Sequence, residues 1–243
     1  MKSLVLGATS GVGRALSEDL CAEGSDLLII SSANEDLAAL SIHLFLIYGV
    51  EVKYLEVDAS SLESLEMLCQ CVKSFGKLDK IFLPIGASSD GDSGILSSKM
   101  ISDITNINFL FSVNFIESLL KLDLINPCSK IVGFGSIASI RGRKNNKIYS
   151  ASKSALCSYF QSLAHQLFPD GYEVYFFKLG YINTQQTFGR TLLFSPAEAK
   201  NVSNFVRKKI QIGSGEFFYP RYWFLISCAI KIIPRFIFNK MDF

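Results

Sequence analysis

The sequence alternates short apolar runs with longer segments of helical periodicity, and this alternation constrains the fold more than any other feature. The apolar runs lie at 3–6, 26–30, 52–57, 80–84, 130–135, 173–179 and 216–220, and the helical patterns at about 11–23, 34–48, 61–75, 102–124, 149–168 and 196–210. The runs are apolar almost throughout, as expected for a parallel sheet covered on both faces. We therefore predict an α/β, single-domain Rossmann fold, a doubly wound parallel sheet of about seven strands with helices on both faces.

Composition and residue usage narrow the functional class. The chain has 243 residues, of which 49% are hydrophobic and 19% charged, enough for a large core. The net charge is +2 and no long basic tract occurs, so no nucleic-acid partner is expected. The six cysteines form no CxxC pair, and His43 and His165 stand alone, so no metal site is expected. Without a signal-peptide pattern, we expect a cytoplasmic protein with reduced thiols.

A glycine-rich stretch follows directly on the first apolar run. "LVLGATSGVGRAL" places Gly7, Gly11 and Gly13 at GxxxGxG spacing. Glycine permits close backbone approach, and a helix starting near Gly11 would direct N–H groups and its positive dipole end at the loop. This context is typical of a pyrophosphate site, so the loop is predicted to bind a dinucleotide; a tight turn without a ligand is the alternative. The predicted contacts are Gly7, Thr9, Ser10, Gly11, Val12 and Gly13.

Three further residues stand in an order that indicates carbonyl chemistry. Ser136 ends the fifth apolar run, and Tyr149 and Lys153 in "YSASK" are spaced to share one face of a helix. With the glycine loop upstream, this set resembles the short-chain dehydrogenase/reductase family over residues 1 to about 220. The resemblance implies interconversion of a ketone and a secondary alcohol by hydride transfer. Ser136 would polarise the carbonyl, Tyr149 would act as acid and base, and Lys153 would lower the pKa of Tyr149 and bind the nicotinamide ribose.

The same resemblance implies further site residues. Asn108 would hold a water that relays protons to Lys153, with Asn114 as the alternative asparagine. Three segments depart from the family pattern, since Leu6 and Leu179 replace a threonine and a proline, and "LPIGAS" replaces the usual NNAG. The remaining implied cofactor contacts are Asp58, Ala59, Gly86, Gly180, Ile182 and Thr184.

The end of the second apolar run bears on the choice of cofactor. An acidic residue there would bond the ribose hydroxyls of NAD and repel the 2′-phosphate of NADP. The sequence instead reads "LLIISSANED", with Ser31, Ser32 and Ala33 in the turn. We therefore expect Ser32 to contact the cofactor and NADP to be preferred, with NAD as the alternative.

The C-terminal segments leave the substrate open. Residues 185–199 would form a partly apolar substrate lid, and Ser195, Pro196 and Glu198 predict a capped helix start. Residues 1–220 would form the nucleotide-binding domain, and 221–243 an apolar and basic extension. This extension would pack on the protein, the interpretation we favour, or lie peripherally on a membrane.

The expected partner is a small carbonyl or alcohol substrate, and the family implies a homodimer or homotetramer. The "GEFFYP" ending resembles a branch acting on keto-sugars that are carried on polyprenyl phosphate or belong to surface polysaccharides. A fatty-acyl or steroid-type ketoreductase and a nucleotide sensor without turnover remain as alternatives.

Overall fold

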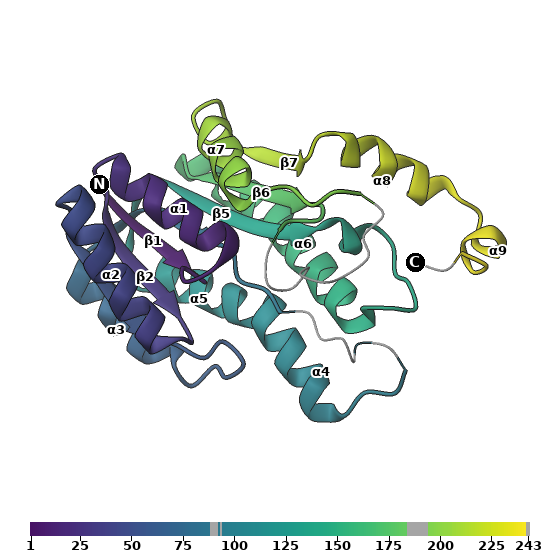
Figure 1. Cartoon of the computed structure of the whole chain (residues 1–243), viewed down its shortest axis with the longest axis horizontal. Helices are drawn as coiled ribbons and strands as arrows, with labels where there is room; N and C mark the ends of the chain where they lie inside the picture. The colour runs from purple at the N-terminus through teal and green to yellow at the C-terminus, as the bar shows by residue number, and fades with distance from the viewer. Residues whose placement is uncertain (88–91, 93, 184–193, 242–243) are drawn as a thin grey trace.

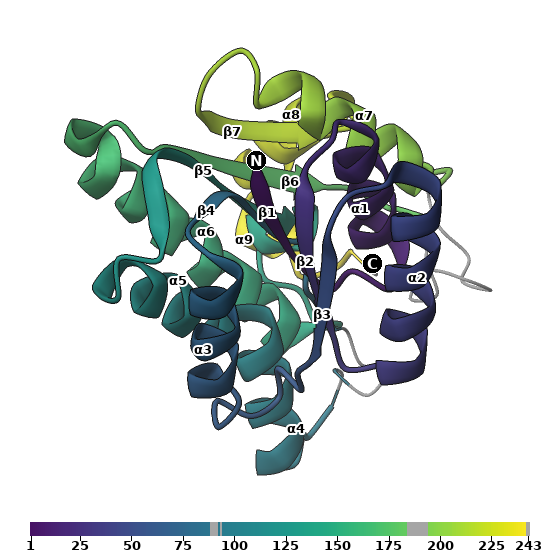
Figure 2. The same cartoon turned by 90° about the vertical axis from the view of Figure 1, so that its left-hand side faces the viewer.

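The chain folds around one parallel sheet. The structure is a computed structural model, and it describes residues 1–87, 92, 94–183 and 194–241. Seven strands lie in the order β3-β2-β1-β4-β5-β6-β7, and every neighbouring pair is parallel. This arrangement confirms the predicted doubly wound α/β fold (Figures 1 and 2). The strands are β1 (Lys2–Leu6), β2 (Asp26–Ser31), β3 (Val52–Glu56), β4 (Leu78–Leu83), β5 (Ile125–Ser136), β6 (Glu173–Leu179) and β7 (Gly215–Tyr219).

Helices cover both faces of the sheet and bury two apolar clusters. One cluster packs the sheet against α1 (Gly11–Ala22), α2 (Asn34–Tyr48) and α7 (Ala199–Lys209). The other packs it against α3 (Leu65–Phe75), α5 (Phe111–Lys121) and α6 (Lys147–Leu167). Because both faces are covered there, the side chains of β1, β2, β4 and β6 are buried almost throughout, as the apolar runs predicted, whereas Lys53, Tyr54 and Glu56 of the edge strand β3 are exposed. Figure 2 shows the two helical layers on opposite sides of the sheet.

The helix predicted over 102–124 differs from the observed structure. It consists of α4 (Ser98–Thr105), a π-helical turn (Asn106–Leu110) and α5. A π turn places one more residue in the loop of each hydrogen bond, and such turns occur often at functional sites. The turn carries Asn108, which is fully buried. The predicted helix start at Ser195 is also wrong, because α7 begins at Ala199 and Glu198 occupies its N-cap.

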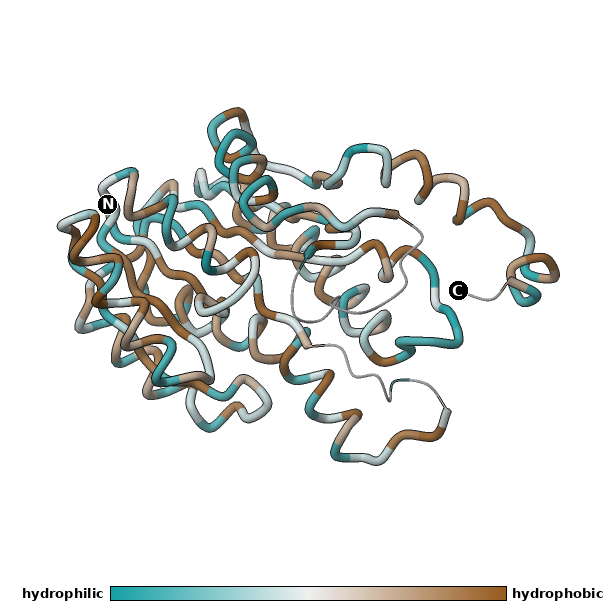
Figure 3. Tube along the Cα trace, viewed as in Figure 1, coloured by the Kyte–Doolittle hydropathy of each residue, from teal (hydrophilic) through white to brown (hydrophobic). Residues whose placement is uncertain are grey.

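The segment after β7 forms two helices that lie along one end of the body. They are α8 (Tyr222–Ile232) and α9 (Arg235–Phe238), the yellow helices of Figure 1. Trp223 and Ser227 of α8 and Phe238 of α9 are buried against the rest of the chain. Figure 3 shows apolar colour both inside the sheet and along these helices. In the described residues, no helix is both long and apolar enough to cross a membrane.

Candidate active site

A cavity of 450 Å³ opens at the carboxyl ends of the central strands. Parallel sheets of this kind bind ligands at that edge, where the direction of the strand order reverses beside β1. Its lining extends from the β1–α1 loop to the start of α6. Of the residues predicted for the site, the lining includes Gly7, Ser10, Gly11, Val12, Ser32, Asp58, Ala59, Gly86, Ser136, Tyr149, Lys153, Gly180 and Ile182.

The glycine loop is closed tightly against the first helix. A Cβ atom on Gly13 would lie 1.9 Å from the carbonyl oxygen of Gly7, so only glycine allows this approach of α1 to the loop. Ser10 is the N-cap residue of α1, and no side chain caps that helix end. The first N–H groups of α1 therefore have no side-chain acceptor and face the cavity side of the loop, which suits a phosphate group.

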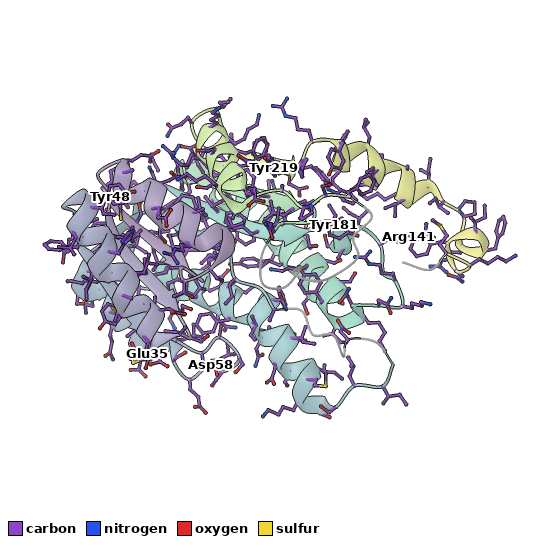
Figure 4. All side chains as sticks on the ribbon, in the orientation of Figure 1. Glu35, Tyr48, Asp58, Arg141, Tyr181 and Tyr219 are labelled. Atoms are coloured by element: carbon purple, nitrogen blue, oxygen red, sulfur yellow. The ribbon has the colours of Figure 1, made fainter. Side chains whose placement is uncertain are left out.

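The part of the cavity near the ends of β2 and β3 contains hydroxyl groups and one carboxylate. Thr9 Oγ1 and Ser31 Oγ are hydrogen-bonded at 2.8 Å, which joins the glycine loop to the end of β2. Ser32 is exposed beside them and lines the cavity. Asp58 accepts the N–H of Ser60 at 2.8 Å, so its side chain is turned toward its own loop after β3. Figure 4 labels Asp58, and also Glu35 in the first turn of α2.

Ser136 and Tyr149 meet where β5 leads toward α6. Burial raises the pKa of Tyr149, whereas a hydrogen bond with the Ser136 hydroxyl and the positive charge of Arg143 act to lower it. The short helix Ile137–Ile140 fixes the approach, since Ser150 Oγ donates to the Ala138 carbonyl at 2.7 Å and Ser154 Oγ to the Ser139 carbonyl at 2.8 Å. The short helix and these two hydrogen bonds thus fix the position of the Ser136 hydroxyl relative to the Tyr149 hydroxyl.

Lys153 is buried one helical turn beyond Tyr149. Its Nζ donates to the carbonyl oxygen of Ile85 at 2.9 Å and to that of Phe134 at 3.1 Å. Burial lowers the pKa of Lys153 to about 7. Ile85 lies two residues after the end of β4 and Phe134 lies near the end of β5, so the lysine connects the loop after β4 to β5. The influences that lower the pKa of Tyr149 in this structure come from Ser136 and Arg143 instead.

Asn108 holds the loop after β4 in place. Its Nδ2 donates to the carbonyl oxygens of Ala87 and Ile104 at 2.7 and 2.8 Å, and its Oδ1 accepts the N–H of Ala87 at 3.2 Å. A Cβ atom on Gly86 would lie 3.1 Å from both Asn108 Oδ1 and Lys153 Nζ, so these two side chains meet around Gly86. Neither asparagine lines the cavity, and Asn114, the alternative, donates to the carbonyl oxygen of Leu110 one turn earlier rather than to the loop at Gly86.

The segment after β6 bounds another part of the cavity. A Cβ atom on Gly180 would lie 2.0 Å from Trp223 Nε1, so Gly180 leaves room for the indole of α8. Ile182 is buried and forms an isolated bridge with Ala197. Thr184, and most of the predicted substrate lid, lie outside the described residues.

Two charged residues near the site were missed by the sequence analysis. Asp92, 1% exposed, accepts the N–H groups of Ile148 and Tyr149 at the start of α6. Arg143 lines the cavity beside Asn146 and Tyr149. The basic run "RGRKNNK" directly before "IYSASK" was a signal for Arg143, whereas nothing local in the sequence connects Asp92 with α6.

The arrangement can bind an elongated phosphate-containing molecule and move a proton. The open amides of the glycine loop lie at one end of the cavity, and the phenol of Tyr149 lies at the other with a serine hydroxyl as its partner. No carboxylate lies beside Tyr149 among the described residues that line the cavity. A carbonyl oxygen placed between Ser136 and Tyr149 could accept two hydrogen bonds and then a proton.

Comparison with known proteins places this geometry in context. Residues 2–190 match the family model described as short chain dehydrogenase. An uncharacterized oxidoreductase of Bacillus subtilis, YmfI, is 27% identical over 83% of this chain and 81% of its own length. The 3-oxoacyl-[acyl-carrier-protein] reductase FabG of Haemophilus influenzae is 26% identical over 76% of this chain and 75% of its own length.

A solved structure shares the fold. The short-chain dehydrogenase from Sphingobium yanoikuyae in complex with NADPH superimposes with a TM-score of 0.82 at 18% identity, covering 96% of each chain. The likeness therefore extends over nearly the whole chain.

Proposed function

The chain belongs to the short-chain dehydrogenase family of oxidoreductases, and from that premise we propose that it interconverts a ketone and a secondary alcohol with NADP(H), using Tyr149 as acid and base. The observation that carries the proposal is that Ser136, Tyr149 and Lys153 lie together at one end of a cavity, and the glycine loop lies at its other end. This group of residues provides a proton donor next to a cavity that can bind a nucleotide.

The residues present fit a nicotinamide dinucleotide. The uncapped start of α1 and the glycines of its loop would hold the pyrophosphate, together with Thr9 and Ser10 of the loop and Val12 in the first turn of α1. Ser32, Asp58 and Ala59 would contact the adenosine part. Gly86, Lys153, Gly180, Ile182 and Thr184 would surround the nicotinamide riboside. When bound, the cofactor would supply the hydride in reduction and accept it in oxidation.

The chain's own groups would handle the oxygen atom and its proton. The Ser136 hydroxyl would donate a hydrogen bond to the substrate oxygen, which lowers the cost of developing negative charge there. The Tyr149 hydroxyl would give its proton to that oxygen in reduction and take it back in oxidation. Burial raises the pKa of Tyr149, which favours the protonated hydroxyl that reduction requires. Asn108 would hold the loop at Gly86 in place and so fix the position of the Lys153 amine beside it.

The direct test is turnover by the full chain with NADPH and a panel of ketones. Tyr149→Phe removes the proton donor and keeps the ring, so we expect the rate to fall by at least about a hundredfold, the scale of acid–base catalysis. Tyr54→Phe is the matched control, because Tyr54 is exposed on β3 and does not line the cavity. Undiminished turnover in Tyr149→Phe would refute the assignment, and nucleotide binding without turnover of any ketone would favour the nucleotide sensor.

The preference for NADP rests on the turn after β2. No acidic residue stands at Ser31, Ser32 or Ala33, so nothing in that turn repels a 2′-phosphate. The structure from Sphingobium yanoikuyae was solved with NADPH, which supports the same choice. Tighter binding of NADH than of NADPH would reverse it and leave the enzyme class intact.

Two substrate classes compete. The FabG relative is named for a 3-oxoacyl substrate, which favours an acyl ketone. The ending "GEFFYP" supports a keto-sugar, free or lipid-linked, because of its resemblance to the polyprenyl-phosphate branch. Turnover of 3-oxoacyl thioesters compared with a keto-sugar panel, each at equal concentration, would separate the two.

We propose that the extension 221–243 packs on the domain of residues 1–220, which the burial of Trp223 and Phe238 supports, and the alternative is a peripheral contact with an anionic membrane surface through its outer side. Its outer side presents large apolar groups, with Leu225, Ile232 and Phe236 at least 70% exposed. Arg221, Lys231, Arg235 and Lys240 are exposed around them, and the described part of the extension contains no acidic residue. Such a mixture suits insertion at the headgroup level. Cosedimentation with vesicles of anionic lipid, lost in Phe236→Glu, would support this contact.

Self-association is proposed through the helices that carry Asn108 and Tyr149, giving a homodimer or homotetramer. Tyr159 of α6 donates to Glu117 of α5 at 2.7 Å, which joins these helices into one surface. Light scattering on the purified chain decides the state, and a monomer at micromolar concentration would refute it.

A further inference from the structure

Arg143 lines two pockets of the protein. It lines the 450 Å³ cavity beside Tyr149, and it also lines a second pocket of 370 Å³. Lys144 of the same loop and Lys147, the first residue of α6, also line the second pocket, together with Phe238 and Met241 of the C-terminal segment. The loop before the catalytic helix therefore joins the proposed reaction centre to a pocket that is basic on one side and apolar on the other.

The two sides of this second pocket are fixed to one another. Arg141 Nη1 donates to the carbonyl oxygens of Ile230 and Ile233 at 2.9 and 2.5 Å, where α8 ends. Its guanidinium also lies 4.0 Å from the ring centre of Phe238. Figure 4 labels Arg141 beside the C-terminal helices. Because Arg141 is only two residues from Arg143, the apolar wall is held at a defined place beside Arg143.

Arg143 itself is half-buried and incompletely bonded. Its Nε is buried and has no hydrogen-bond partner among the described residues. A buried N–H group without an acceptor costs stability, and the cost is larger for a charged group. Asp58, the acidic residue among the described lining of the two pockets, lies at the adenine end. Lys147 differs from Arg143, since its Nζ donates to the carbonyl oxygen of Gly94.

An arginine in this state matches an incoming oxyanion. The guanidinium offers parallel N–H groups that pair with both oxygens of a carboxylate or phosphate. Phe238 and Met241 offer apolar surface within the same pocket. We propose that Arg143 binds a carboxylate or phosphate group of the carbonyl substrate, and that an apolar part of the substrate lies against Phe238 and Met241. This inference rests on the proposed function, because it defines the substrate class of the same site.

The anion is distinct from the phosphates of the cofactor. Arg143 follows β5, whereas Ser32 follows β2, and β1 and β4 lie between these strands. Three strand spacings separate them, roughly 14 Å across the sheet. The pyrophosphate site at the β1–α1 loop lies on the near side of β4. An anion at Arg143 therefore lies at the β5 end of the cavity, away from the proposed sites of the nucleotide phosphates.

Direct binding to the full chain, with no turnover required, tests the proposal. The probes are octyl phosphate, octanoate and neutral 1-octanol, titrated into protein saturated with NADPH and, separately, into protein alone. We expect both anions to bind at least about tenfold more tightly than octanol, as for a hydrogen bond to a charged group. The stronger of the two anions identifies which oxyanion the site favours. Equal affinity for octanol and for both anions would overturn the proposal.

Variants locate the effect. Arg143→Gln should lose the advantage of the anions over octanol, whereas Arg143→Lys should keep part of it, because the charge stays and the fork is lost. Lys208→Gln removes the same charge from an exposed position of α7 and should match the unmodified chain. Circular dichroism confirms that each variant is folded. If Arg143→Gln does not fold, Arg143→Lys decides alone. Unchanged anion binding in Arg143→Lys would refute paired hydrogen bonds from the guanidinium to the anion.

Failure of this inference and failure of the proposed function give different results. Absence of ketone turnover in the unmodified chain would refute the function. Absence of anion selectivity, in a chain that does reduce neutral ketones, would refute only the role of Arg143.

Discussion

The carboxylate of Asp92 accepts the backbone N–H of Tyr149 at 2.8 Å and that of Ile148 at 3.0 Å. The main-chain oxygen of Asp92 also accepts the N–H of Asn146 at 2.7 Å. Asn146 is the N-cap residue of α6, has a left-handed backbone with φ of 61°, and supplies no side-chain cap. A residue distant in sequence thus caps the helix that carries the proposed proton donor.

This relationship makes Asp92 a positioning residue. Asp92→Asn keeps the volume but replaces one acceptor oxygen by a donor, so one of the two N–H groups loses its partner. We expect a loss of about 1 kcal/mol in the free energy of unfolding, as for an N-cap, and a lower kcat with little change in the binding of NADPH. Asp170→Asn, at an exposed carboxylate beyond the far end of α6, is the control. An unchanged kcat in a destabilised Asp92→Asn would show a purely structural cap.

Ser32→Asp should invert the nucleotide preference. A carboxylate at the end of β2 can accept the ribose hydroxyls of NADH and repels the 2′-phosphate of NADPH. We expect the ratio of NADPH to NADH affinity, followed by nicotinamide fluorescence, to fall by at least about tenfold. Ser32→Asn, which is similar in size but neutral, controls for shape. If both variants behave alike, the 2′-phosphate does not lie beside residue 32.

Lys153 should leave a signature in the pH dependence of stability. Its pKa is lowered to about 7 in the folded chain, from an unfolded value of 10.5. Between these values the unfolded chain binds the extra proton, so the free energy of unfolding gains a positive contribution as pH rises from 7 to 10.5. The full penalty of burying the charged amine is present below pH 7.

Lys153→Met removes this contribution. Denaturant unfolding at a series of pH values should show the variant gaining on the unmodified chain as pH falls through that window. The difference between the two chains cancels the titration of other groups. A difference that is constant across the window would contradict the lowered pKa. NADPH binding should weaken in the same variant, which reports the proposed ribose contact separately.

Gly180→Ala tests the close packing of the Trp223 indole against Gly180. The new Cβ atom would lie 2.0 Å from Trp223 Nε1, and the indole is 4% exposed, so α8 must shift. We expect a loss of about 1–3 kcal/mol, typical of overpacking, in thermal or denaturant unfolding. Adding Trp223→Leu should make the cost of the alanine smaller. Gly142→Ala is the control, since nothing lies within 4 Å of a Cβ atom there. Equal effects at the two glycines would contradict the close contact.

The core of the fold was predictable because it depends on local patterns. The apolar runs anticipated all seven strands of the sheet, since the inner strands are covered on both faces and are therefore apolar almost throughout. Gly13 was also recognisable, because close approach of a helix to the loop before it requires a residue without a side chain. Irregularities were not recognised: the π turn at Asn106–Leu110 retains helical periodicity, and the apparent cap at Ser195 is not used.

The sequence by itself determined which chemical groups are available and in which order: the glycine loop, then Asn108, then Ser136, Tyr149 and Lys153. This was possible because residues four apart lie on one face of a helix, and the carboxyl ends of parallel strands lie at one edge of the sheet. Only the tertiary structure decided the partners of these groups. It brought Asp92 to the start of α6, set Lys153 on the carbonyl groups of Ile85 and Phe134, and placed Phe238 opposite Arg143. Such contacts join segments far apart along the chain, and they form because the crossovers of the sheet bring the strand ends to one edge.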